Sequence, residues 1–147
     1  MTNQISISRI FDAPRELVYQ AFVDPDQLAR WFGPVGASVP RDTVEIDARV
    51  GGRLRFVMTV DADPGFRNPI DAVFTAVTEN ELLVADMAAE GVPGVDGTLR
   101  ATLRLEFHDE GDGKTRLELR QGPFDPEIGD QTRTGWESSF TKLDALL

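Results

Sequence analysis

The middle of the chain, residues 41–121, alternates apolar and polar side chains over several short runs. The clearest run is residues 99–107, where Leu, Ala, Leu, Leu and Phe alternate with Arg, Thr, Arg and Glu. A period of two places the apolar side chains on one face of a β-strand and the charged ones on the other. The pattern predicts an antiparallel sheet with one solvated face and one face that another element must cover. Turn residues separate the runs at Gly51-Gly52, Asp63-Pro64-Gly65, Glu79-Asn80, the loop 90–97 and the hairpin 109–113.

The last segment of the chain supplies a cover for this sheet. Trp136, Phe140, Leu143 and Leu147 recur at intervals of four, three and four residues. This spacing predicts an amphipathic helix of about four turns. We expect its apolar stripe to pack on the apolar face of the sheet, with its polar residues in solvent.

Two short helices are predicted between a first strand at residues 5–11 and the rest of the sheet. Pro14 and Pro25 each stand in the first turn of one helix, where the missing N–H group costs no hydrogen bond. Gly33 ends the second helix. The order is one strand, two short helices, about six strands and one long helix, with no linker or repeat. A single α+β domain spanning residues 1–147 is therefore predicted.

Composition narrows the classes of partner and cofactor. The chain has 25 acidic and 15 basic residues and a net charge of −10, so we expect neither nucleic acid nor a membrane surface as a partner. It has no cysteine and one histidine, which excludes thiolate catalysis, zinc–sulfur sites and a multi-histidine metal site within one chain. We expect no metal and no cofactor. No apolar run is long enough for a bilayer, and the first ten residues do not resemble a signal peptide. A cytoplasmic location is predicted.

Two ionisable residues are candidates for catalysis. His108 is in phase with Arg104 and Glu106 on the charged face of its strand, which favours a solvated surface histidine over a general base. Asp86 lies in a largely apolar run, residues 82–87. It is the acid that would support an enzyme, provided that it faces inward and has a displaced pKa.

Large apolar side chains are abundant: nine Phe, two Trp, one Tyr and three Met. They either fill the core or line a cavity. A long helix that crosses the concave face of a curved sheet contacts the sheet closely at one end, which leaves space at the other. The residues that we expect around this space are Trp31, Phe56, Met58, Phe74, Met87 and Trp136.

Four segments together resemble one protein family. They are residues 9–22 (RIFDAPRELVYQAF), 24–34 (DPDQLARWFGP), 49–58 (RVGGRLRFVM) and 135–143 (GWESSFTKL). These segments resemble bacterial proteins grouped with the C-terminal domain of the heat-shock protein 90 ATPase activator. That group belongs to the START-like helix-grip superfamily, together with Bet v 1-type proteins and polyketide cyclases.

The resemblance covers essentially the whole chain and implies a fold. This fold is a curved antiparallel sheet of six to seven strands around a long C-terminal helix, with two short helices after the first strand and an apolar cavity inside. The resemblance also implies site residues: Trp31 and Phe32 at the cavity rim, Phe56 and Met58 on its floor, and Trp136 and Phe140 on its wall.

The leading functional hypothesis is non-catalytic binding of a hydrophobic or aromatic small molecule in that cavity. Ser139, Thr75 and Arg133 are the polar residues expected to orient the ligand. One alternative is a polyketide cyclase-like or hydrolase-like enzyme that uses Asp86. Another is a co-chaperone-like interaction domain, which the charged outer face of the sheet disfavours. A homodimer is a further assembly that the sequence leaves open.

Overall fold

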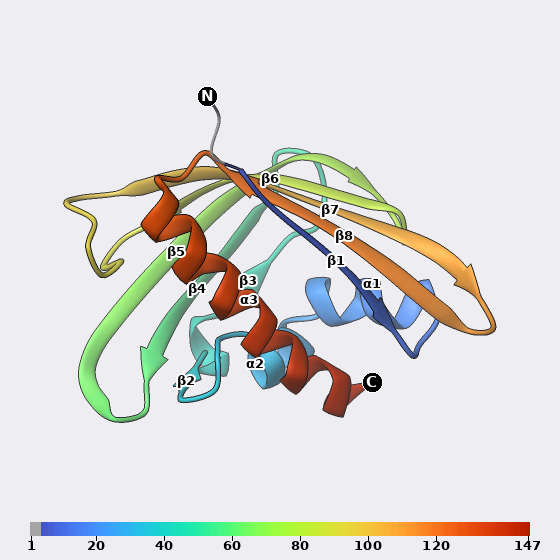
Figure 1. Ribbon diagram of the computed structural model, residues 1–147, viewed down its shortest axis with the longest axis horizontal. Coiled ribbons are helices and arrows are strands. Elements are labelled where there is room, and N and C mark those ends of the chain that lie inside the picture. Colours follow the sequence, from blue (N-terminus) through green and yellow to red (C-terminus); the bar gives the residue numbers. More distant parts are fainter. Residues whose placement is uncertain (1–3) are drawn as a thin grey trace.

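The computed structural model describes residues 4–147 and has the predicted α+β architecture (Figure 1). Seven strands form one antiparallel sheet in the order β1-β8-β7-β6-β5-β4-β2, and the short β3 pairs with β4. The strands are β1 (Ile5–Phe11), β2 (Ala37–Ser38), β3 (Glu45–Ile46), β4 (Arg53–Val60), β5 (Asp63–Thr78), β6 (Leu82–Ala89), β7 (Leu99–Gly111) and β8 (Lys114–Gly122).

Three α-helices complete the fold, together with a 3-10 turn, η1 (Arg41–Thr43). The sheet curls around α3 (Pro126–Leu146), which lies along its concave side (Figure 1). The short helices α1 (Arg15–Val23) and α2 (Pro25–Trp31) follow β1 and lie toward the C-terminal end of α3. No helix among residues 4–147 is long and apolar enough to cross a lipid bilayer.

Helix α3 is 21 residues long, and so exceeds the predicted four turns. Asp125 caps its N-terminus, because the carboxylate accepts hydrogen bonds from the backbone N–H groups of Glu127 and Ile128 at 2.9 and 3.1 Å. Pro126 occupies the first turn. The first ten residues of α3 contain few large apolar side chains, so periodicity alone did not reveal them.

One predicted strand and one predicted turn differ from the structure. The segment 44–48 alternates like a strand, yet only Glu45 and Ile46 pair, because the chain folds back on itself just after them. At Gly52 a Cβ atom would lie 2.0 Å from the Asp47 carbonyl oxygen, so this close approach requires glycine. The turn predicted at Asp63 instead lies at residues 61–62, and β5 begins at Asp63.

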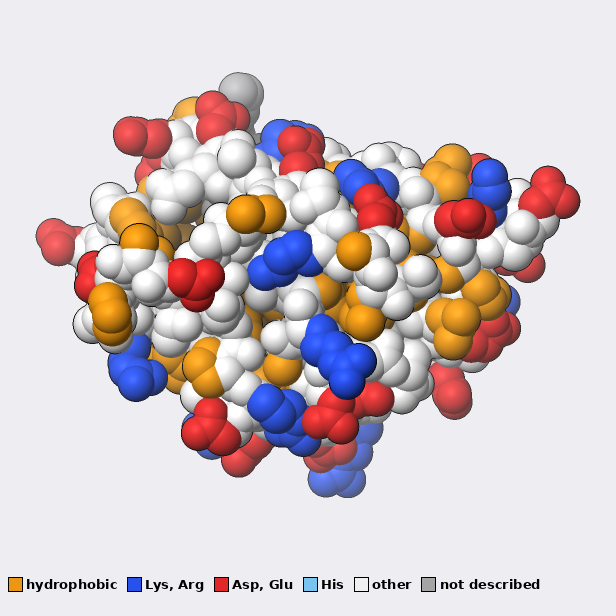
Figure 2. Space-filling model, turned by 90° about the horizontal axis from the view of Figure 1, so that it is seen from below, with side chains coloured by type: hydrophobic (Ala, Val, Ile, Leu, Met, Phe, Trp, Pro, Cys, Tyr) orange, Lys and Arg blue, Asp and Glu red, His pale blue; other side chains and the backbone are white. Residues whose placement is uncertain are grey.

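The core is tightly packed where α1, α2 and the C-terminal half of α3 meet the sheet. Trp31 and Phe140 are fully buried there. The indole Nε1 of Trp31 donates to the Ala21 carbonyl oxygen at 2.9 Å, which joins α2 to α1. Charged side chains lie outside, and on the face shown in Figure 2 hydrophobic groups form small patches between Lys or Arg and Asp or Glu.

Candidate functional site

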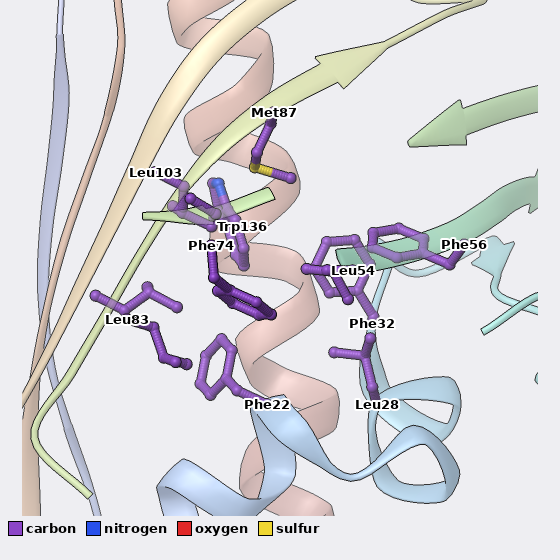
Figure 3. Close-up of a pocket in the computed structure, with 12 residues that line it drawn as sticks. Phe22, Leu28, Phe32, Leu54, Phe56, Phe74, Leu83, Met87, Leu103 and Trp136 are labelled. Carbon is purple, nitrogen blue, oxygen red and sulfur yellow. The ribbon is translucent and has the colours of Figure 1, made fainter. Parts of the chain in front are cut away.

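Two hollows lie between the sheet and α3. The inner hollow has a volume of about 30 Å³, which is about the share of liquid volume that one water molecule takes. Figure 3 shows side chains from the sheet, from α1, from the α2 region and from α3 converging on it. Its lining is entirely apolar or aromatic: Phe22, Leu28, Phe32, Leu54, Phe56, Phe74, Leu83, Ala85, Met87, Leu103, Leu105 and Trp136.

The outer hollow is larger, with a volume of about 290 Å³. It lies against the middle of α3, from Gln131 to Ser139, where Thr132, Gly135 and Ser139 are small. The sheet contributes Ala37, Met58, Val60, Phe66, Asn68, Ile70, Met87, Ala89, Leu99, Ala101 and Gln121. Helix α3 contributes Gln131, Thr132, Gly135, Trp136 and Ser139, and connecting segments contribute Phe32, Gly33, Pro34, Val92, Pro93 and Phe124.

Three side chains line both hollows and separate them: Phe32, Met87 and Trp136. The Phe32 ring meets the Trp136 ring edge-on at a centroid distance of 5.3 Å. It also meets the Phe56 ring at 4.7 Å. Such edge-to-face contacts stabilise aromatic pairs beyond their burial alone, so the partition is well packed.

Buried polar side chains interrupt the apolar wall of the outer hollow. The indole Nε1 of Trp136 donates to Gln121 Oε1 at 2.7 Å. The Ser139 hydroxyl donates to the Gly135 carbonyl oxygen at 2.8 Å, and the Asn68 amide donates to the Glu90 carbonyl oxygen. None of the described residues that line this hollow has a charged side chain.

Seven of the nine residues predicted from the sequence as binding residues lie on these walls. Phe56 and Phe74 face the inner hollow, and Met58 and Ser139 face the outer one. Phe32, Met87 and Trp136 touch both.

Trp31 and Phe140 line neither hollow, so their expected places at the rim and wall were wrong. Trp31 lies on the same buried side of α2 as Leu28, whereas Phe32 follows the last turn and reaches the hollows. Phe140 belongs to the tightly packed half of α3. Its ring meets Phe11 edge-on at 5.4 Å.

The other polar candidates also lie elsewhere. Thr75 is exposed, because it follows the inward-facing Phe74 on β5. The Arg133 guanidinium donates to the Ser6 carbonyl oxygen at 2.9 Å and does not line the hollow. Sequence analysis missed Asn68 and Gln121, although each is a polar residue at an inward-facing position of its strand. That mismatch with the alternation was the signal that could have identified them.

Neither ionisable candidate reaches the hollows. Asp86 is exposed, and its carboxylate accepts a hydrogen bond from the Thr102 hydroxyl at 3.0 Å. The enzyme hypothesis thereby loses the residue on which it depended. His108 Nε2 lies 3.2 Å from Glu106 Oε1, and 41% of its side chain is exposed. Among residues 4–147 no three His, Asp or Glu side chains are grouped as metal ligands would be.

The Glu106 carboxylate makes a testable contribution to stability. The hydrogen bond from Arg104, at 2.8 Å, and a weaker contribution from His108 hold the pKa of Glu106 below its ordinary value. A carboxylate with a lowered pKa stabilises the fold above its unfolded pKa and loses this effect as pH falls through the folded pKa. Glu106→Gln is expected to lower the free energy of unfolding at pH 7 by about 0.2–1 kcal/mol, since the pair is partly exposed.

The difference between wild type and Glu106→Gln should shrink as pH falls below about 4.3, the ordinary pKa of glutamate. Urea unfolding between pH 7 and pH 3 measures this difference. A difference that grows steadily toward pH 3 would contradict the assigned role of Glu106.

A curled antiparallel sheet that holds a C-terminal helix, with two short helices after its first strand, defines a helix-grip protein of the α+β class. The family described as "Activator of Hsp90 ATPase homolog 1-like protein" matches residues 12–147, and the chain belongs to this family. The match confirms the resemblance drawn from the four sequence segments. No curated protein sequence matches the chain.

Solved structures share the fold over almost the full length. A Chromobacterium violaceum protein is 25% identical with a TM-score of 0.84, and the match covers 99% of this chain and 97% of that one. A Mycobacterium smegmatis protein is 27% identical with a TM-score of 0.80, with coverage of 99% and 91%. A Plasmodium falciparum protein described as an HSP90 activator is 19% identical with a TM-score of 0.69, with coverage of 98% and 95%. At 19% identity that likeness concerns the fold alone.

Proposed function

We propose that the protein binds a lipophilic or aromatic small molecule in the outer hollow and does not transform it. The observation that carries the proposal is a hollow of about 290 Å³ with aromatic and aliphatic walls and a few buried polar groups. Small-molecule sites generally combine these features, at volumes from about 300 Å³ upward. A ligand of about two fused rings matches this size.

The hydrophobic effect supplies the affinity. A ligand that removes about 200 Å² of apolar surface from water gains about 5 kcal/mol. Part of this gain offsets the freedom lost on association. We therefore expect simple aromatic ligands to bind with dissociation constants of about 0.01–1 mM.

The test uses 2-naphthol and 2-acetylnaphthalene with the wild-type protein. At ten times its dissociation constant, either probe should raise the free energy of unfolding by about 1.4 kcal/mol. The midpoint of thermal unfolding should then rise by about 3–5 °C. Isothermal titration measures the dissociation constants independently.

The two indole N–H groups provide an internal control in nitrogen–proton NMR spectra. Trp136 lines the outer hollow, whereas Trp31 is buried against the Ala21 carbonyl oxygen. The Trp136 indole signal should shift on titration while the Trp31 signal moves little. If neither probe at 1 mM shifts the Trp136 signal or raises the unfolding midpoint, the proposal is wrong.

A second candidate is an interaction with heat-shock protein 90, which the family description favours. The outer face of the sheet carries ion pairs of opposite charge, such as Arg53 and Arg55 with Asp71 at 3.1 and 3.3 Å. Such a face suits a polar partner surface better than an apolar one. If this candidate is right, the protein should raise the ATPase rate of the heat-shock protein 90 from its own cell severalfold. An unchanged rate at saturating concentration would remove it.

A further inference from the structure

Gln121 presents a hydrogen-bond donor to the outer hollow whose partner in the protein is a weak one. The residue is only 7% exposed. An indole Nε1 can only donate, so its bond from Trp136 identifies the accepting atom of Gln121 as Oε1. Nε2 then points elsewhere, and its contact is the Met87 sulfur at 3.6 Å. A thioether is a weak acceptor, so an amide group with two N–H bonds retains donor capacity beside the hollow.

Asn68 presents the complementary group, an unused acceptor. The residue is 5% exposed. A carbonyl oxygen can only accept, so the bond to Glu90 identifies the donor as Asn68 Nδ2 and leaves Oδ1. Among residues 4–147 no group donates to Oδ1, and no fully enclosed side-chain nitrogen or oxygen lacks a partner. Oδ1 therefore keeps accessible surface, and the outer hollow is the space that Asn68 lines.

These two amides lie at separate places on the wall. Asn68 is on β5 and Gln121 is on β8, with β6 and β7 between them. Two different groups of one elongated ligand are needed to meet both. A charged ligand group would lose hydration without meeting an opposite charge, since the described lining has none.

Resting on the proposed function, we propose that the outer hollow selects elongated uncharged ligands with a hydrogen-bond acceptor for Gln121 Nε2 and a donor for Asn68 Oδ1. An aromatic ketone with a hydroxyl group at its far end belongs to this class. The aromatic body fills the apolar space between the amides, and each polar end meets the one amide atom, Gln121 Nε2 or Asn68 Oδ1, that has no strong partner in the protein.

The test is a series of three naphthalenes titrated against wild type at pH 6.5. The first, 6-acetyl-2-naphthol, has both polar groups; 2-acetylnaphthalene lacks the hydroxyl; 6-hydroxy-2-naphthoate replaces the acetyl group by a carboxylate. We expect 6-acetyl-2-naphthol to bind about tenfold more tightly than 2-acetylnaphthalene. It should bind at least about tenfold more tightly than the carboxylate.

A matched pair of variants assigns the acceptor end to Gln121. Gln121→Glu keeps an oxygen for the Trp136 indole, removes the donor and adds a negative charge. It is expected to weaken 6-acetyl-2-naphthol at least about tenfold. Gln20→Glu makes the same chemical change at an exposed position of α1 that lines neither hollow, and it should change the affinity less than about twofold. Asn68→Leu should abolish the advantage of 6-acetyl-2-naphthol over 2-acetylnaphthalene.

The outcomes separate this inference from the function on which it rests. If 2-acetylnaphthalene binds but 6-hydroxy-2-naphthoate binds as well as 6-acetyl-2-naphthol, the selectivity is wrong and the binding function stands. Equal effects of Gln121→Glu and Gln20→Glu would likewise overturn the role of Gln121. If none of the three probes binds wild type, both the function and its selectivity are wrong. The wild-type series needs no variant to fold, so it decides the matter alone if Gln121→Glu is unstable.

Discussion

Phe140→Ala is expected to lower the free energy of unfolding by about 3–5 kcal/mol, the usual loss for a large buried aromatic side chain. The Phe140 ring is fully buried. It packs at 5.4 Å from the Phe11 ring and at 5.6 Å from the Trp136 ring. The Arg9 guanidinium lies over it at 5.8 Å, which adds a cation–π attraction. Removing the ring leaves a closed cavity that these rigid neighbours cannot fill. Urea unfolding followed by circular dichroism measures the loss.

Met58→Ala is the control, because Met58 is large and apolar but lies on the wall of the outer hollow. Its truncation enlarges a space that already exists and creates no new closed cavity. We expect a loss of about 1 kcal/mol, close to the transfer free energy of the atoms removed from partial burial. Losses of equal size at Met58 and Phe140 would contradict the distinction between a packed half and a hollow half of the molecule.

The same distinction explains how much of the fold the sequence could predict. Long strands such as β7 alternate strictly and face a single core, so periodicity identified them. Residues 129–135 of α3 are small or polar, so this part of the helix shows no helical spacing of apolar residues. For that reason its helical structure could not be predicted from the sequence. In segment 44–48 the sequence alternates as in a strand, but the structure has a strand of two residues only. The chain turns back at Gly52, close to the Asp47 carbonyl oxygen, and this turn ends the pairing.

The sequence could predict the site residues that lie on strands, because alternation shows which side chains face inward. Phase placed Phe56, Met58 and Phe74 on the inner face, where they line the hollows. It could not separate Trp31 from Phe32, because the end of α2 decides which ring enters the core. Asn68 shares the inward phase of Ile70 on β5, but its polar side chain does not mark it as part of an apolar lining.

Gly135→Phe is expected to weaken binding of 2-acetylnaphthalene at least about tenfold without destabilising the fold. Gly135 lies on α3 and lines the outer hollow. A Cβ atom added there meets no heavy atom within 4 Å, so the first atom of a side chain has open space. The new ring would occupy the space proposed for the ligand. Replacing glycine inside a helix also removes its entropic penalty, so the free energy of unfolding should stay level or rise by about 0.5 kcal/mol.

Gly135→Ala separates occupation of the hollow from the effect on the helix. Alanine gains the same helical preference, so the free energy of unfolding should rise by about 0.5–1 kcal/mol. A single methyl group leaves most of the roughly 290 Å³ open, so affinity should stay within about threefold of wild type. Isothermal titration and urea unfolding of the two variants give both quantities. If Gly135→Phe retains full affinity while remaining folded, the assignment of the ligand to this hollow is wrong.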